Sequence, residues 1–274
     1  MMPSPSRRWV APVCFAALLA LALGWYRLMQ VSLRPTALAS GIGLFVLLVV
    51  LAIFNARKQL PFLPLLKASS WMKFHAFAGW FSIGLFLFHI QFRIPNGRLE
   101  VLLALLFGAV AASGVIGLMI SRSLPARLTR HGEEVIWERI PALRRQLLQT
   151  VENLILDSVA ETSSSTLADL YANRLKLYFE RPADLWWHIL GSNRPLHTRL
   201  ARLTALDRYL NEKERSIAVA MTECIRAKAN LDFHYACQGL LRCWLFFHIP
   251  LTYSLILVAL VHGILAWSFT GSGV

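Results

Sequence analysis

Charged residues are scarce in this chain, and the few acidic ones are confined to one region. Only 16% of the 274 residues are Asp, Glu, Lys or Arg, whereas 56% are hydrophobic. Fourteen of the fifteen acids lie between Ser121 and Arg242, and the remaining one is Glu100. A water-soluble protein of this length would not bury so much apolar surface, so the composition indicates a bilayer environment.

Several motifs that would define a cofactor or nucleotide site are missing. The four cysteines form no CxxC pair and no CxxCH sequence, which argues against covalent attachment of a c-type haem. The chain also has no GxGxxG loop, no Walker A loop and no iron–sulfur cysteine run. Dinucleotide, nucleoside triphosphate and iron–sulfur chemistry are therefore not expected of this chain.

The formal net charge of +13 is also found in nucleic-acid-binding proteins, but its distribution indicates another origin. The region 121–242 is nearly balanced, with eighteen basic residues against fourteen acids, and the rest of the excess flanks apolar runs. Short basic flanks of this kind are orientation signals of membrane helices. We expect membrane lipid, and no nucleic acid, as a partner.

Five apolar segments are long enough to cross about 30 Å of hydrocarbon as helices. They lie at 9–26, 37–55, 71–91, 99–120 and 243–269. The first resembles a signal peptide, but its run is long and no clear cleavage motif follows, so it is interpreted as a retained helix. The sequence predicts an all-α integral membrane protein with transmembrane helices one to four in 1–120, a helical insertion in 121–242, and the fifth helix with a short tail in 243–274.

The basic residues also predict how these helices are oriented. One set of loops is rich in them, namely the N-terminus with Arg7 and Arg8, the 57–73 loop with Arg57, Lys58, Lys67 and Lys73, and the whole insertion. The alternate loops hold only Arg27, Arg34, Arg93 and Arg98. The positive-inside rule therefore places the N-terminus and the insertion in the cytoplasm and the C-terminus on the opposite side, as in a multi-pass protein of a bacterial inner membrane.

Inside the insertion, the sequence predicts helices and no cofactor motif. Apolar residues between 135 and 155 keep a helical spacing, and 167–179 is typical of a second helix. Asn211 followed by Glu214 resembles a capping box, which predicts that a further helix begins there and runs toward the fifth span.

Four histidines fall on two of the predicted spans with the same spacing. His75 and His89 lie on the third span and His248 and His262 on the fifth, each pair in the form H-x13-H. Fourteen helical residues turn to within about 40° of four complete turns and rise about 21 Å. Each pair therefore lines one face of its helix, with one imidazole near each membrane surface.

Topology then predicts which histidines meet. One helix separates the third span from the fifth, so these two run in the same direction and their histidines fall at matching depths. We expect His75 and His248 to ligate an inner haem iron and His89 and His262 an outer one, which makes two b-type haems inside a four-helix bundle. Polar groups are costly at this depth and tend to mark function.

A single histidine in a membrane helix is more often a polar packing contact than a ligand. Two same-face pairs at equal spacing on parallel helices are harder to explain in that way. The four other histidines, which all lie in the insertion, are isolated from other ligand types and are expected to be ordinary surface or core residues: His131, His188, His197 and His234.

At these histidines the chain resembles the dihaem four-helix core of membrane cytochromes. Paired H-x13-H motifs on helices separated by one helix are similar to cytochrome b of quinol-oxidising complexes. Their placement on the third and fifth helices resembles ferric reductases and NADPH oxidases. The resemblance implies haem ligation by His75, His89, His248 and His262; the PEWY motif of the quinol-binding cytochrome b loop does not occur here.

The expected function is transmembrane electron transfer through two bis-histidine b haems, as an electron carrier rather than a stand-alone enzyme. Electrons are expected to pass between a cytoplasmic or quinone partner and a partner on the opposite side, with the direction left open. The insertion either docks a redox partner protein or supports the haem helices from the cytoplasmic side. Two alternatives stay open: a cytochrome subunit of a quinol dehydrogenase or metal reductase, and a haem-free membrane scaffold or sensor. Basic residues near the membrane surfaces either pair with haem propionates or serve only as topology anchors: Arg57, Lys58, Lys67, Lys73, Arg93 and Arg98.

Overall fold

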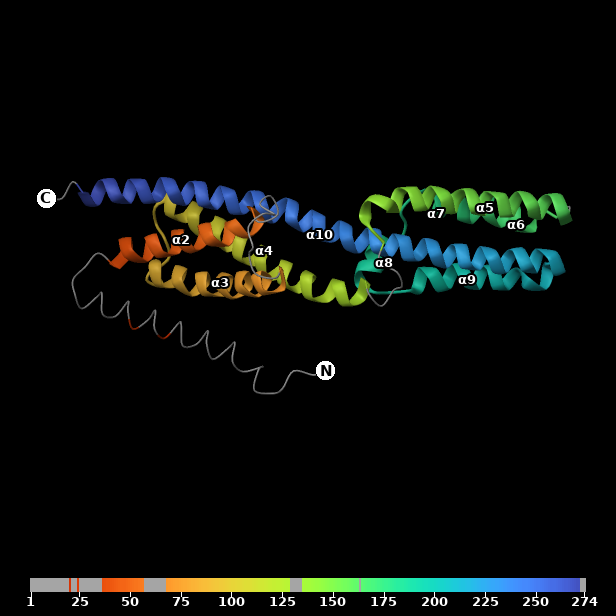
Figure 1. Cartoon of the computed structure of the whole chain (residues 1–274), viewed down its shortest axis with the longest axis horizontal. Coiled ribbons are helices and arrows are strands. Elements are labelled where there is room, and N and C mark those ends of the chain that lie inside the picture. Colours follow the sequence, from red (N-terminus) through yellow and green to blue (C-terminus); the bar gives the residue numbers. More distant parts are fainter. Residues whose placement is uncertain are drawn as a thin grey trace. The chain divides into compact units, whose positions relative to one another are not determined.

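A computed structural model describes residues 36–56, 68–128, 135–162 and 164–271, together with Ala20 and Gly24. Every regular element in these ranges is a helix, which confirms the all-α prediction (Figure 1). The first predicted span at 9–26, the basic loop residues Arg57, Lys58 and Lys67, and His131 lie outside the described residues.

The chain divides into two compact units, each described by itself. The first comprises residues 1–119 and 244–274 and contains α2, α3, most of α4 and the C-terminal part of α10. The bounds of these helices are Thr36–Ala56, Ala68–His89, Arg98–Leu128 and Glu212–Gly271. The second unit comprises residues 120–243 and holds the shorter helices.

An apolar core holds together the four helices that are described in the first unit. Leu44 and Leu48 of α2, Phe107 of α4 and Leu255 of α10 are buried in one cluster. Phe86 of α3 completes it by stacking on Phe107, with ring centroids 4.1 Å apart. Each helix thus contributes apolar side chains to a common centre, as in a helix bundle.

Two of the described helices are long and apolar enough to cross a membrane. These are α4 over Arg98–Leu124 and α10, whose candidate range is Glu212–Phe269. The apolar part of α2, Ala37–Ile53, is shorter. The count of five spans therefore stays a prediction.

The fifth predicted span is not a separate helix, because α10 begins at Glu212 and continues to Gly271. Its start is the predicted capping box. The backbone N–H of Asn211 donates to Glu214 Oε2 at 3.0 Å, and the N–H of Glu214 donates to Asn211 Oδ1 at 2.9 Å. These reciprocal bonds satisfy two backbone donors that a helix N-terminus leaves free.

The second unit is a bundle of helices packed on the first half of α10. In chain order its elements are η2 Trp137–Arg139, α5 Ile140–Thr162, α6 Thr166–Leu170, the π-helical turn η3 Tyr171–Leu175, α7 Lys176–Glu180, α8 Leu185–Leu190, α9 Arg194–Leu206 and η4 Asp207–Tyr209. Val151, Leu167, Phe179, Leu203 and Ile225 meet in its core. The helices predicted at 135–155 and 167–179 correspond to α5 and to the α6–η3–α7 run.

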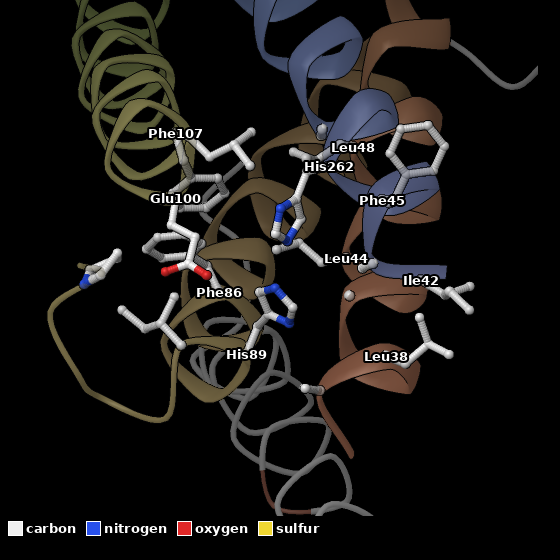
Figure 2. A pocket seen from close by; sticks show the side chains of 18 of the residues that line it. Leu38, Ile42, Leu44, Phe45, Leu48, Phe86, His89, Glu100, Phe107 and His262 are labelled. Atoms are coloured by element: carbon white, nitrogen blue, oxygen red, sulfur yellow. The ribbon is translucent and has the colours of Figure 1, made fainter. Parts of the chain in front are cut away.

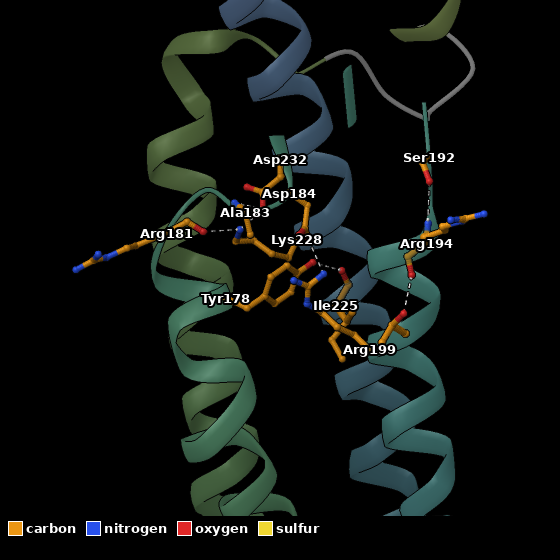
Figure 3. Close-up of polar contacts among 11 residues, drawn as sticks. Tyr178, Arg181, Ala183, Asp184, Ser192, Arg194, Arg199, Ile225, Lys228 and Asp232 are labelled. Carbon is orange, nitrogen blue, oxygen red and sulfur yellow. Dashed lines mark hydrogen bonds and ion pairs between the residues drawn. The ribbon is translucent and has the colours of Figure 1, made fainter. Parts of the chain in front are cut away.

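A fully buried ion pair on α10 connects this helix to neighbouring segments of the second unit (Figure 3). Lys228 pairs with Asp232 one turn later and also donates to the carbonyl of Arg181 at 3.0 Å. Asp232 accepts the backbone N–H of Ala183 at 3.1 Å and lies 3.5 Å from the guanidinium of Arg144. Burial raises the pKa of Asp232 and lowers the pKa of Lys228, and their mutual attraction opposes both shifts.

Candidate functional site

Two of the predicted ligands face each other at one end of the first unit. His89, the last residue of α3, and His262 of α10 have ring centroids 6.5 Å apart with an angle of 86° between the ring planes. Figure 2 shows the two imidazoles pointing toward one another from their helices. The structure thus brings together a pair that is 173 residues apart in the chain.

A serine on α2 contacts one ring nitrogen of His89. Ser40 Oγ lies 3.2 Å from His89 Nδ1 and donates its own proton to the carbonyl of Ala37 at 3.1 Å. When the Ser40 hydroxyl donates to Ala37, its Oγ can accept the Nδ1–H of His89. The other ring nitrogen, Nε2, then carries the lone pair that a metal ion requires.

The residue after this serine makes room for the imidazole. A Cβ atom at Gly41 would lie 3.0 Å from Cε1 of His89 and 3.7 Å from its Nε2. These distances are at or below ordinary van der Waals contact, so a side chain at this position would push the ring out of place. Ser40 and Gly41 thus form one short segment of α2 that orients His89.

His89 and His262 line a large cavity in the first unit (Figure 2). Its volume is about 880 Å³, within the range typical of cofactor pockets. The wall is mostly apolar and includes Leu44, Phe45, Leu48, Phe86, Phe107 and Leu255. A few polar residues also line it, namely Gln91, Arg93, Asn96 and Glu100. Arg93, one of the predicted propionate partners, therefore lies at the cavity.

The second predicted pair lies on the same two helices. His75 of α3 is near His248 of α10, within range of direct electrostatic interaction, and the backbone of Leu51 on α2 is another neighbour of its ring. The spacing of fourteen residues on each helix separates this pair from the first by about 21 Å along the helix axes. The two helices therefore carry two levels of paired imidazoles.

A serine–glycine pair on α4 orients His248 as the pair on α2 orients His89. Ser113 Oγ lies 3.0 Å from Nδ1 of His248, and Gly114 faces the same ring, since a Cβ there would be 3.9 Å from its Cε1. Trp244 stacks on His248 with centroids 5.1 Å apart and donates its indole N–H to the carbonyl of Ser113 at 2.8 Å. In the tautomer in which Nδ1–H of His248 donates to Ser113 Oγ, Nε2 carries the lone pair for a ligand.

Trp244 also determines how closely α4 and α10 approach. A Cβ at Gly117 would overlap the indole ring of Trp244, so only glycine fits at that position. One turn before His75, the indole N–H of Trp71 is buried and has no acceptor among the described residues. A buried donor of this kind is rare in proteins, and it leaves a hydrogen bond available for a bound group.

No family model, curated protein or solved structure matches this chain. The interpretation of the site therefore rests on its geometry and on the histidine pattern. The contacts of these serines and glycines with the histidines were not predicted from the sequence, although the sequence contains a repeated pattern at these positions. Ala-Ser-Gly occurs at 39–41 and again at 112–114, and in each case the serine contacts Nδ1 of a predicted ligand.

The remaining predicted residues lie elsewhere. His188, His197 and His234 belong to the second unit, where His234 is fully buried and His197 is exposed. Arg98 is the first residue of α4 and Lys73 an exposed residue of α3, and neither lines the cavity around His89. Among the candidate propionate partners that the structure describes, only Arg93 lines that cavity.

Proposed function

We propose that this chain is a multi-pass membrane cytochrome that passes electrons across the bilayer through two b haems. His75 and His248 hold the inner haem iron, and His89 and His262 hold the outer one. The observation that carries the proposal is the facing pair His89 and His262 at 6.5 Å, with Nδ1 of His89 fixed by Ser40, in a cavity of about 880 Å³.

The surface of the first unit supports a membrane location. Only 11% of the residues in the apolar window of α4 and 6% of those in the window of α10 are buried. The core helix of a soluble protein would be mostly buried, so an exposed apolar surface of this kind requires another cover. Leu105, Phe246 and Trp267 are examples of large side chains that are more than 60% exposed. Lipid is the cover that the proposal assigns to them.

The residues around the outer pair fit a haem. Two imidazoles that ligate one metal ion from opposite sides have ring centres about 6 Å apart, given metal–nitrogen bonds of about 2 Å and five-membered rings of ordinary bond length. The observed 6.5 Å is close to this value. The cavity wall is apolar and aromatic, and Arg93 supplies a cation suited to a propionate.

A haem held by two histidines would supply one-electron chemistry, and such ligation suits electron transfer better than binding of oxygen. The chain supplies orientation and exclusion of water. Ser40 and Ser113 direct Nε2 of their histidines toward the ligand, while Gly41 provides the space that the ring of His89 occupies. The apolar wall formed by Phe86, Phe107 and their neighbours keeps water from the outer site.

The two levels of histidines define the route of the electron. The proposal places one redox partner on the cytoplasmic side, either a soluble protein docked on residues 120–243 or a quinone, and the other partner on the opposite side. An electron moving against the membrane potential costs about 2.3 kcal/mol per 100 mV. The direction of transfer is therefore decided by the potentials of the two partners, and the chain itself is an electron carrier.

An absorption spectrum of the purified chain tests the proposal directly. We expect a Soret band and, after reduction by dithionite, a sharp α band, with two non-covalent haems per chain. His89→Ala or His262→Ala removes the outer haem, and His75→Ala or His248→Ala removes the inner one. His197→Ala, an exposed residue of α9, is the matched control and retains both haems. A purified, folded chain with no haem absorbance would refute the proposal and favour the scaffold or sensor alternative.

A further inference from the structure

The indole N–H of Trp71 is a buried hydrogen-bond donor on the helix that carries His75. Its nitrogen is shielded from solvent and has no acceptor within the described part of the chain. A buried donor that stays unpaired costs free energy, and native proteins leave few of them. An acceptor on a bound molecule would recover this cost.

Trp71 lies on the face of α3 that is turned into the helix bundle. Ala78 and Ser82 are buried, and Trp71 and His75 are partly buried, whereas residues 72–74 are exposed. The spacings of four, three and four residues place these four side chains on one helix face. The indole is therefore about 6 Å along the axis from His75 and on the same side of the helix.

A second tryptophan has the same position relative to the other inner histidine. Trp244 precedes His248 by four residues on α10, as Trp71 precedes His75 on α3. The indole N–H of Trp244 donates to the carbonyl of Ser113 at 2.8 Å. Of these two indoles, only that of Trp244 finds an acceptor among the residues that the structure describes. The donor on α3 is therefore the one available to a ligand.

The first unit has no carboxylate of its own near Trp71. Glu100 is the one acidic residue in the sequence of this unit, and it lines the cavity around His89. Trp71 precedes His89 by eighteen residues on α3, which is about 27 Å of helix. A carboxylate that pairs with this indole is therefore expected to belong to a bound molecule.

We propose that Trp71 donates its indole N–H to a propionate of the inner haem and is a further cofactor-binding residue. Propionates lie on the rim of a haem, so their partners are expected beside a ligand histidine. An indole N–H can only donate and a carboxylate can only accept, and the negative charge strengthens the bond. The proposal rests on haem binding by His75 and His248, which belongs to the proposed function.

A role at the membrane interface is the alternative explanation for Trp71. Tryptophans of the interface keep the N–H in reach of water or lipid headgroups. The buried nitrogen of Trp71 has no such access in the structure. The two explanations differ in their consequence, because an interface residue would not act on the properties of a haem.

Trp71→Phe tests the proposal in the full chain, since it removes the N–H and keeps an aromatic ring. We expect the midpoint potential of the inner haem to fall and that of the outer haem to stay unchanged. A propionate without its donor keeps more negative charge, which favours the oxidised iron. Infrared difference spectra between the oxidised and reduced chain, with ¹³C in the propionate carboxyls, are expected to show a shifted carboxylate band.

Trp80→Phe is the matched control for both measurements. It makes the same substitution on α3 at a residue that is 46% exposed, and it is expected to leave the potential and the carboxylate band unchanged. If Trp71→Phe gives the same potential and the same band as Trp80→Phe, the bond to the propionate is overturned and the interface explanation is favoured.

A second variant covers the case in which Trp71→Phe loses the inner haem. Phe74 contacts the indole edge to face, with ring centroids 5.8 Å apart, and Phe74→Leu removes this contact while the N–H stays. Loss of the inner haem in Trp71→Phe alone supports the proposal. Equal loss in both variants shows that packing of the indole is what matters, and overturns it.

The haem content of the unmodified chain separates this proposal from the proposed function. If that chain binds both haems and Trp71→Phe behaves as Trp80→Phe does, only the role of Trp71 fails. If the purified, folded chain binds no haem, the proposed function fails, and the role of Trp71 fails with it.

Discussion

At the scale of single residues, two serines contact Nδ1 of histidines that we propose as haem ligands. Ser40 Oγ lies 3.2 Å from Nδ1 of His89, and Ser113 Oγ lies 3.0 Å from the same nitrogen of His248. Groups that orient a metal ligand in this way matter nearly as much as the ligand itself. Each serine is therefore expected to affect one haem and leave the other unchanged.

The first prediction follows from this selectivity. Ser40→Ala weakens retention of the outer haem by roughly 10-fold or more, and Ser113→Ala does the same for the inner haem, as expected for loss of an orienting partner. Haem content after gel filtration and the midpoint potential of each haem measure the effect. Ser82→Ala is the control, since this buried serine of α3 donates to the carbonyl of Gly79 in its own helix. Loss of both haems to the same extent in each variant would contradict the assignment.

A second prediction concerns the space beside His89. Gly41→Ala places a methyl group 3.0 Å from Cε1 of the ring and is expected to displace it and reduce the outer haem absorbance. Gly43→Ala is the matched control two residues later on α2, because its Cβ meets only Leu85 Cδ2 at 4.0 Å. Both substitutions favour helix formation. A loss of outer haem absorbance in Gly41→Ala alone therefore reflects the site and not a change in helix stability. An unchanged spectrum in Gly41→Ala would show that the ring does not require this space.

At the scale of the helix, α10 serves both units, and its two ends are stabilised by different interactions. The capping box of Asn211 and Glu214 defines its start. Fourteen residues after Glu214, Lys228 begins the buried ion pair with Asp232, and the C-terminal part carries His248 and His262. A buried pair contributes little net stability when intact, but removal of one partner leaves a costly isolated charge.

The third prediction addresses the start of α10. Asn211→Ala removes the acceptor for the N–H of Glu214 and is expected to cost about 1 kcal/mol of stability. Asn193→Ala is the control, because Asn193 stands at the equivalent position before α9 and its side chain makes no capping hydrogen bond. Thermal unfolding of the full chain, followed by circular dichroism, compares the two. An equal effect of both substitutions would show that the reciprocal bonds contribute nothing specific.

The fourth prediction concerns the ion pair and gives the direction in which the stability of each variant changes with pH. Lys228→Met leaves Asp232 buried with only Arg144 as a cation and is expected to cost about 3–5 kcal/mol, whereas Lys228→Met combined with Asp232→Leu costs much less. In the single variant, burial keeps the pKa of Asp232 above its unfolded value of about 3.9. Protonation then stabilises the folded state at acid pH, and this stability is lost as the pH rises through the raised pKa.

The complementary variant, Asp232→Leu, is expected to show the opposite dependence of stability on pH. Asp232→Leu leaves Lys228, whose pKa burial lowers, so its folded state binds fewer protons than the unfolded chain and gains stability as the pH rises. Unfolding temperatures of the two single variants across acid to alkaline pH measure these slopes. Parallel pH dependence in both would contradict the assigned directions of the shifts.

At the scale of the whole molecule, the two levels of histidines make one prediction about transport. In vesicles with a reductant outside and an acceptor trapped inside, the wild-type chain is expected to reduce the acceptor, because both levels lie on one route. His248→Ala and His89→Ala each remove one level and should abolish transfer, while His197→Ala keeps it. Transfer that persists in either variant would mean that the electron does not use both sites.

The sequence by itself determined the features that depend on neighbours along the chain. The spacing of His75 to His89 and of His248 to His262 places each pair on one helix face, and Asn211 with Glu214 defines a helix start, because these relations arise within one helix. The continuity of α10 through Cys243 was not predicted as such, since the change from polar to apolar composition at that residue suggested a boundary.

Only the tertiary structure decided which side chains meet across helices. Ser40 is 49 residues from His89 and Ser113 is 135 residues from His248, so no local periodicity relates them. The same holds for Arg127 and the carbonyls of α8, which are 61 and 62 residues away. Such contacts depend on how apolar faces pack and on which helix becomes the neighbour of which, and both follow from the fold as a whole rather than from the residues beside each one.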